Sequence, residues 1–146
     1  MTDEQLVRLV VNCSRAIAKD WCTPAGELIE RAMAELDRRS IGSNESPVLR
    51  RVGYRVGAAG LRWLDRKALI DLILNHEVPV LKHWSGDWGQ PATRQRYVML
   101  YKTLKLYAGR FGGKPEMAHA LANWLHDADY VRQSYSVNLQ PKASTT

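Results

Sequence analysis

The sequence contains no apolar run long enough to cross a lipid bilayer, which takes about 18 residues or more. Its most apolar stretch, residues 69–74, is short and is interrupted by Asp71. The N-terminal residues also lack the positive charge of a secretory signal, because Asp3 and Glu4 stand where basic residues would be needed. We therefore expect a cytoplasmic protein that makes no contact with membranes.

Cysteine is scarce, and its two copies are poorly spaced for a disulfide. If Cys13 lies on the first predicted helix, a rise of about 1.5 Å per residue puts Cys22 roughly 13 Å away, beyond the reach of a disulfide. Two reduced, largely buried thiols are the expected state, and such thiols are typical of a reducing compartment.

Motifs of common enzyme and metal sites are also missing. No glycine-rich phosphate loop follows a strand, and no Gly-x-Ser-x-Gly elbow occurs. His119 and His126 would share a helix face about 10 Å apart along the axis, whereas a zinc ion needs ligands about 2 Å from it. We expect neither an enzyme nor a site for a metal or cofactor.

What the sequence does contain is helical periodicity. Apolar residues recur at three- and four-residue spacing along most of the chain, which predicts an all-α fold. We expect a single compact domain of about five to six helices over 1–132, with a tryptophan-containing loop at 82–92 and a flexible polar tail over 133–146. Helix starts are indicated by the capping pattern Thr2-Asp3-Glu4-Gln5 and by the prolines of Thr23-Pro24, Ser46-Pro47 and Pro115.

The helix predicted to begin at Ser46-Pro47 is unusual because it contains Gly53, Gly57 and Gly60. Glycine in a helix interior costs up to about 1 kcal/mol relative to alanine. We interpret the three glycines as positions where the backbone of a neighbouring helix approaches closely. On this interpretation the helix continues through them, and a fourth helix begins near Asp65.

Positive charge is concentrated in the middle of the chain. Residues 47–114 carry 13 basic and 4 acidic side chains, a balance of +9, whereas residues 1–46 and 115–146 have balances of −2 and −1. An anionic partner would require such a concentration, so the middle segment is the expected place for a binding surface.

The first candidate for that surface is a strip of arginines on the third predicted helix. At about 100° per residue, Arg51, Arg55 and Arg62 fall within roughly 40° of one another, and Arg66 joins them if the helix runs on. Guanidinium groups aligned in this way match the oxygens of phosphate groups. The alternative is a solvated face, or ion pairs with acidic residues of the second predicted helix.

A second candidate is the loop that contains Trp84 and Trp88 and leads into Arg94 and Arg96. Indole rings beside cations suit stacking on nucleobases together with contact to phosphates. The alternative is that both tryptophans fold back onto the helices as part of the core.

These features predict a nucleic-acid-binding module that contacts the phosphate backbone largely without regard to sequence, with RNA or single-stranded DNA favoured. The predicted site residues are Arg51, Arg55, Arg62, Arg66, Arg94, Arg96, Lys102, Lys105, Trp84 and Trp88. In size, helicity and charge the chain is similar to the small helical subunits of CRISPR effector complexes, which line the path of guide and target. That general resemblance, which no single motif carries, implies a small subunit of a larger RNA-guided defence complex.

The rival interpretation is a protein-binding adaptor or inhibitor, such as a phage- or plasmid-type accessory protein. In that case the basic face would contact an acidic protein surface, and the tryptophans would anchor the interface. Salt dependence distinguishes the two, because binding to a phosphate backbone weakens steeply as the salt concentration rises.

Overall fold

The chain forms helices and no strands within residues 1–19, 23–40, 48–78, 88–111 and 113–138, which a computed structural model describes. The α-helices are α1 (Asp3–Lys19), α2 (Thr23–Ser40), α3 (Val48–Arg51), α4 (Trp63–Asn75), α6 (Arg94–Phe111) and α7 (Ala118–Asn138). A short 3-10 helix, η1 (Pro115–Met117), directly precedes α7. The predicted all-α class is therefore confirmed.

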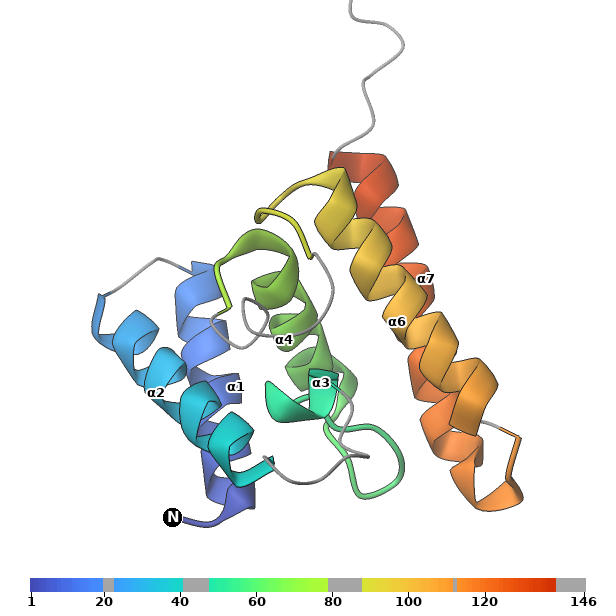
Figure 1. The fold of residues 1–146 in the computed structure, drawn as a ribbon, viewed down its shortest axis with the longest axis horizontal. Coiled ribbons are helices and arrows are strands. Elements are labelled where there is room, and N and C mark those ends of the chain that lie inside the picture. The colour runs from blue at the N-terminus through green and yellow to red at the C-terminus, as the bar shows by residue number, and fades with distance from the viewer. Residues whose placement is uncertain (20–22, 41–47, 79–87, 112, 139–146) are drawn as a thin grey trace, which may run out of the picture.

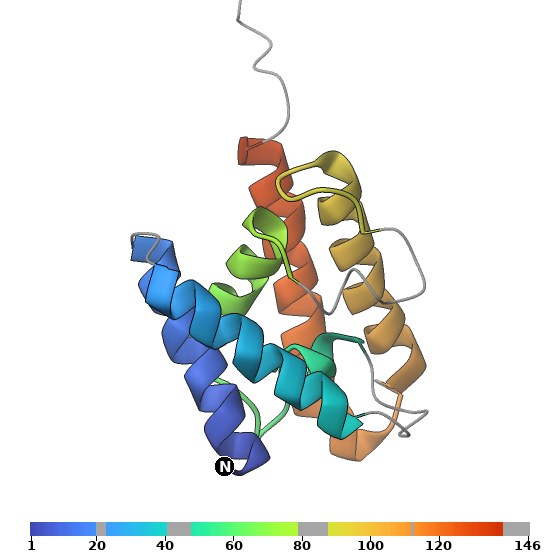
Figure 2. The same cartoon turned by 60° about the vertical axis from the view of Figure 1, so that its left-hand side comes forward.

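The longer helices are arranged as two antiparallel hairpins with α4 between them (Figure 1 and Figure 2). α1 packs against α2 in the first hairpin, and α6 packs against α7 in the second. α4 contacts α1 of the first hairpin and both helices of the second. The described residues thus form the single compact domain that the sequence predicts.

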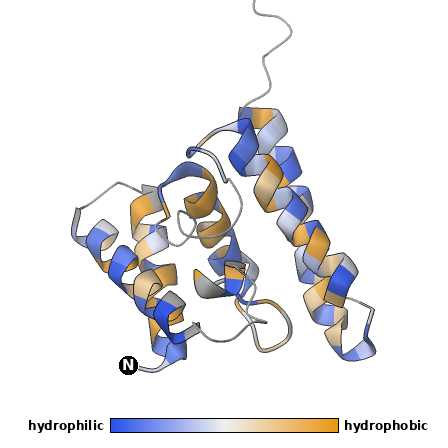
Figure 3. Cartoon of the chain, viewed as in Figure 1, coloured by the Kyte–Doolittle hydropathy of each residue, from blue (hydrophilic) through white to orange (hydrophobic). Residues whose placement is uncertain are grey.

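The central helix α4 supplies the middle of the core. Leu69, Ile70 and Ile73 are completely buried, and buried positions occur on most sides of this helix rather than on one face. A helix that is apolar nearly all round is typical of a buried central element. In the α6–α7 hairpin, by contrast, hydrophilic and hydrophobic segments alternate along each helix (Figure 3).

The first helix begins with the capping box that the sequence predicts. The backbone N–H of Gln5 donates to the Thr2 hydroxyl oxygen over 3.1 Å, and the backbone N–H of Thr2 donates to Gln5 Oε1 over 2.8 Å. Two amides at the helix start are satisfied reciprocally in this way. Farther along α1, Val10 and Val11 are completely buried, as expected of its apolar face.

The third helix is not the continuous rod predicted from the sequence. α3 ends at Arg51, and Gly53 follows in the left-handed region with a φ of 103°. The N–H groups of Gly53 and Tyr54 donate to the carbonyls of Arg50 and Leu49, which is the hydrogen-bond pattern of a glycine-capped helix end. The prediction of a continuous helix is therefore wrong, because the first glycine stops it.

The loop between α3 and α4 is fastened to α7. The Tyr54 hydroxyl donates to Asp127 Oδ2 over 2.5 Å, and the N–H of Gly57 donates to Asn123 Oδ1 over 2.9 Å. Burial and the adjacent Asp127 carboxylate raise the pKa of Tyr54, so its hydroxyl remains a donor.

Asp127 also receives a buried arginine from α4. Arg66 Nε donates to Asp127 Oδ2 over 2.8 Å, and Arg66 Nη1 donates to the Leu61 carbonyl over 2.9 Å. Neither side chain of this ion pair is more than 7% exposed. Removal of one partner would leave the other charge unpaired inside the protein, which is strongly destabilising. The pair therefore ties α4 to α7.

The C-terminal segment is helical further than the sequence predicts. α7 continues to Asn138, so the start of the predicted tail over 133–146 belongs to the helix, and residues 139–146 lie outside the described part of the chain. The Asn138 side chain donates to the Tyr97 hydroxyl over 3.3 Å, and the Tyr135 ring lies 5.8 Å from the Tyr97 ring. These contacts to α6 hold the last turns, which lack a strong apolar face.

Replacement of Asp127 by alanine tests the buried network. The change leaves Arg66 and Tyr54 without their shared acceptor, so we expect the free energy of unfolding to fall by about 3–5 kcal/mol. Asp129→Ala, on the exposed side of the same helix, removes only exposed contacts with Arg132 and Gln133 and should leave the urea midpoint nearly unchanged. Equal midpoints for the two variants would show that the network contributes no stability.

Candidate functional site

Arg96, a predicted phosphate contact, is buried and forms hydrogen bonds within the protein instead. Only 3% of this residue is exposed. Its guanidinium donates to the backbone carbonyls of Ile73, His76, Trp88 and Gly89 at distances between 2.5 and 3.1 Å. Arg96 therefore joins the end of α4 to the start of α6, and its donors are already occupied.

Trp88 also lies in the core instead of on the surface. It is 4% exposed, and its indole N–H has no hydrogen-bond partner within the described residues. A ring buried to this extent cannot stack on a nucleobase, so the prediction of a binding role for Trp88 is wrong. Trp84, the other tryptophan of the predicted loop, lies outside the described residues.

The predicted arginine strip does not form, because its members lie on different elements. Arg66 is buried against Asp127, Arg55 lies in the loop between α3 and α4, and Arg62 immediately precedes α4. The side chain of Arg51 is outside the described part of the structure. The strip depended on one continuous helix, and the cap at the end of α3 removes it.

Arg62 belongs instead to a cluster around the completely buried carboxylate of Asp65. Arg8 and Arg15 reach Asp65 from α1 with N–O distances of 3.1 and 3.2 Å, and Arg62 Nε lies 3.8 Å from it. All three arginines also reach solvent. Because one carboxylate attracts all three, their positive charge is partly neutralised within the protein.

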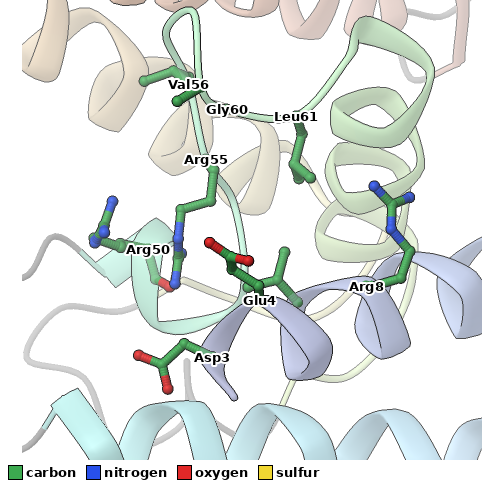
Figure 4. A pocket seen from close by; sticks show the side chains of 10 residues that line it. Asp3, Glu4, Arg8, Arg50, Arg55, Val56, Gly60 and Leu61 are labelled. Atoms are coloured by element: carbon green, nitrogen blue, oxygen red, sulfur yellow. The ribbon is translucent and has the colours of Figure 1, made fainter.

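Arg55 lines a cleft of about 500 Å³ between the start of α1 and the loop that follows α3 (Figure 4). It extends from the loop toward α1, where Asp3 and Glu4 line the same cleft. Arg8 and Arg50 are the other charged residues of its lining. Charges of both signs therefore share this cleft, and it has no strong preference for an anion.

The remaining predicted cations, Arg94, Lys102 and Lys105, lie with Arg110 on the outer side of α6. Arg94, Lys102, Lys105 and Arg110 are exposed along this helix. At about 100° per residue, the four positions lie within an arc of roughly 160°. The buried positions lie on the opposite side, and they are Arg96, Tyr97, Leu100, Leu104, Tyr107 and Ala108. We refer to Arg94, Lys102, Lys105 and Arg110 as the α6 basic face.

Within the described residues, no carboxylate pairs with the α6 basic face. The sequence has no acidic residue between Asp87 and Glu116. The described ion pairs of arginine and lysine belong to other parts of the chain, and their cations are Arg8, Arg15, Arg38, Arg39, Arg62, Arg66, Lys67 and Arg132. The four cations of the α6 basic face are thus not neutralised by any of these carboxylates.

The α6 basic face is long enough to follow a nucleic-acid strand. With a rise of about 1.5 Å per residue, Arg94 and Arg110 are roughly 24 Å apart along the helix axis. One strand of B-form DNA places a phosphate about every 3.4 Å along its own axis. The face can therefore contact several phosphates of one strand.

Arg110 is the member of this face that is missing from the predicted site. Arg94, Lys102 and Lys105 are among the predicted residues, and the structure brings them together on one helix. The lack of acidic residues between Asp87 and Glu116 is a signal in the sequence that identifies α6. That signal includes Arg110 and needs no knowledge of the fold.

Arg96 and Arg94 should behave in opposite ways when each is replaced by alanine. Arg96→Ala leaves buried carbonyls without a donor, at about 1–3 kcal/mol for each such group, so we expect the free energy of unfolding to fall by more than about 2 kcal/mol. Arg94→Ala removes an exposed side chain and should leave thermal unfolding unchanged. A melting temperature that Arg96→Ala does not lower would contradict the structural role of this residue.

None of the described helices combines the length and the apolar character that crossing a membrane requires. Among the described residues, no three histidine, cysteine, aspartate or glutamate side chains gather as the ligands of a metal ion would. The chain matches no protein family, no curated protein and no solved structure.

Proposed function

We propose that the α6 basic face binds the phosphate backbone of a nucleic acid with little regard to base sequence. One observation carries this proposal, namely the division of charge within the molecule. Most cations of the other described helices pair with carboxylates, whereas those on the outer side of α6 have no such partner in the described residues. A polyanion can therefore approach α6 without competing against an internal carboxylate.

The side chains of the α6 basic face suit backbone contacts. Arginine can bind two phosphate oxygens at once, and lysine acts as a point charge with three donors. Contacts of both kinds fix the position of a strand but carry no information about its bases. Each phosphate that is neutralised also releases condensed counter-ions, which makes the affinity fall steeply with salt.

We further propose that the domain acts as a small subunit of a larger nucleoprotein assembly, such as an RNA-guided defence complex. The α6–α7 hairpin lies on one side of the molecule, and the α1–α2 hairpin lies on the other (Figure 1 and Figure 2). Leu28 of α2 and Leu64 of α4 are large apolar side chains that remain exposed. They offer contacts to neighbouring subunits while α6 contacts RNA or single-stranded DNA.

A salt titration of binding to a mixed-sequence single-stranded oligonucleotide tests the proposal. Each phosphate contact on a single strand contributes about 0.7 to the slope of log affinity against log salt. The double variant Lys102→Ala, Lys105→Ala should therefore bind more weakly, with a slope smaller by about 1.4. Arg31→Ala with Arg38→Ala removes the same charge from exposed positions of α2, so this matched control should keep the wild-type slope.

Two outcomes would count against the proposal. If both double variants lose the same part of the slope, net charge rather than the α6 basic face governs binding. If the unaltered protein fails to bind the oligonucleotide even at low salt, the domain is not a nucleic-acid-binding module.

Leu106 tests whether oligonucleotide binding at the α6 basic face depends on phosphate contacts alone. The side chain is 58% exposed and lies between Lys105 and Arg110 on α6, where it could anchor a protein interface. We expect Leu106→Ala to leave oligonucleotide affinity within about twofold, because phosphate contacts do not use an apolar side chain. A large loss of affinity would show that an apolar contact, and not phosphate contacts alone, holds the oligonucleotide at this face.

A further inference from the structure

An apolar cavity of about 310 Å³ lies where the loop after α3 meets the α6–α7 hairpin. Its hairpin side includes Tyr107 and Phe111 of α6, Met117 of η1 and Trp124 of α7. Cavities that bind small ligands have volumes of about 300–1,000 Å³, so this one is suited to a group of modest size.

The aromatic residues of the cavity are packed against one another. The Trp124 ring centroid lies 6.1 Å from that of Phe111 and 6.1 Å from that of Tyr107. Trp124 and Tyr107 are buried, whereas Phe111 and Met117 are partly exposed. The two buried rings therefore support Phe111 and Met117, whose outer surfaces are the ones that a planar group could reach.

Two arginines line the same cavity, Arg50 from α3 and Arg55 from the loop that follows it. Arg50 is exposed, and Arg55 Nη1 donates to the backbone carbonyls of Arg50 and Tyr54 rather than to a carboxylate. Burial and the nearby charge of Arg50 lower the pKa of Arg55 to about 10, so Arg55 remains cationic near neutral pH. An apolar cavity with cations beside it complements a ligand that is both planar and anionic.

The cavity lies next to the end of the α6 basic face. Arg110, the last cation of that face, is adjacent to Phe111, and its guanidinium carbon lies 5.8 Å from the centre of the Phe111 ring. A strand that follows the face toward the end of α6 therefore reaches the cavity next.

We propose that this cavity takes one unpaired nucleobase, stacked against Phe111 and Met117, while Arg50 contacts the phosphate of the same nucleotide. The inference rests on the proposed function of α6 and makes it more specific. A base in a duplex is held by its pairing partner, so the domain should prefer a single strand to a duplex of the same sequence.

Glu116 provides a hydrogen-bond acceptor for the base in the cavity. This exposed residue lines the cavity on the hairpin side, and its carboxylate can accept a hydrogen bond from the exocyclic amino group of a base. Cytosine carries such an amino group, so an oligocytidine is a suitable probe.

The test compares an oligodeoxycytidine with an abasic strand of equal length and charge. Base–aromatic stacking is worth about 1–3 kcal/mol per base, which corresponds to about five- to 150-fold in affinity. We therefore expect the abasic strand to bind at least about fivefold more weakly than the oligodeoxycytidine. Equal affinities would overturn the base pocket but leave the proposed function standing, whereas binding of neither strand would overturn both.

A variant with a larger side chain in the cavity tests whether the difference in affinity between the two strands arises at this site. Met117→Trp puts a larger side chain at the cavity lining, so the two strands should then bind equally, with the affinity of the abasic strand unchanged. Leu28→Trp places the same residue at an exposed position of α2 and should preserve the wild-type difference. If Met117→Trp retains the helical circular dichroism of the wild type and still distinguishes the strands, the base lies elsewhere and the inference is wrong.

Discussion

The buried carboxylate of Asp127 is the group on which the rest of the structure depends. It accepts hydrogen bonds from Arg66 of α4 and from Tyr54 of the loop between α3 and α4, so it connects three segments that are distant in sequence. Burial of an ion pair is costly unless the remaining donors are also satisfied. The Leu61 carbonyl satisfies one of them by accepting from Arg66. The loop that follows the glycine cap of α3 is therefore held against α7.

Contacts inside the protein also determine which positive charges are available to a partner. Arg66 forms a buried ion pair with Asp127, and the arginines that surround Asp65 share its single carboxylate. Arg96 is committed to backbone carbonyls between α4 and α6. On the outer side of α6, no carboxylate of the described residues forms an ion pair with the basic side chains. The proposed binding surface rests on this difference, because the cations of the α6 basic face pair with no carboxylate within the described residues.

Local signals in the sequence were sufficient for much of the fold. The capping box at Thr2 and the apolar periodicity of α6 act within a few residues, so they can be read directly. Gly53 was misinterpreted because a glycine inside an apolar pattern and a glycine at a helix end look alike in sequence; only its φ of 103° distinguishes them. The burial of Arg66 and Trp88 depends on contacts between residues that are distant in sequence, so no local pattern predicts it. Arg110 is different, because the stretch without acidic residues could have identified it.

Backbone amide chemical shifts, followed by NMR while a single-stranded oligonucleotide is added, test the central claim most directly. Each amide reports on its own position, so the map separates α6 from the other clusters of arginine. The account predicts shifts concentrated along α6 at Arg94, Lys102, Lys105 and Arg110, with little change in α2. Shifts concentrated instead around Arg8, Arg15 and Arg62, with α6 unaffected, would contradict it.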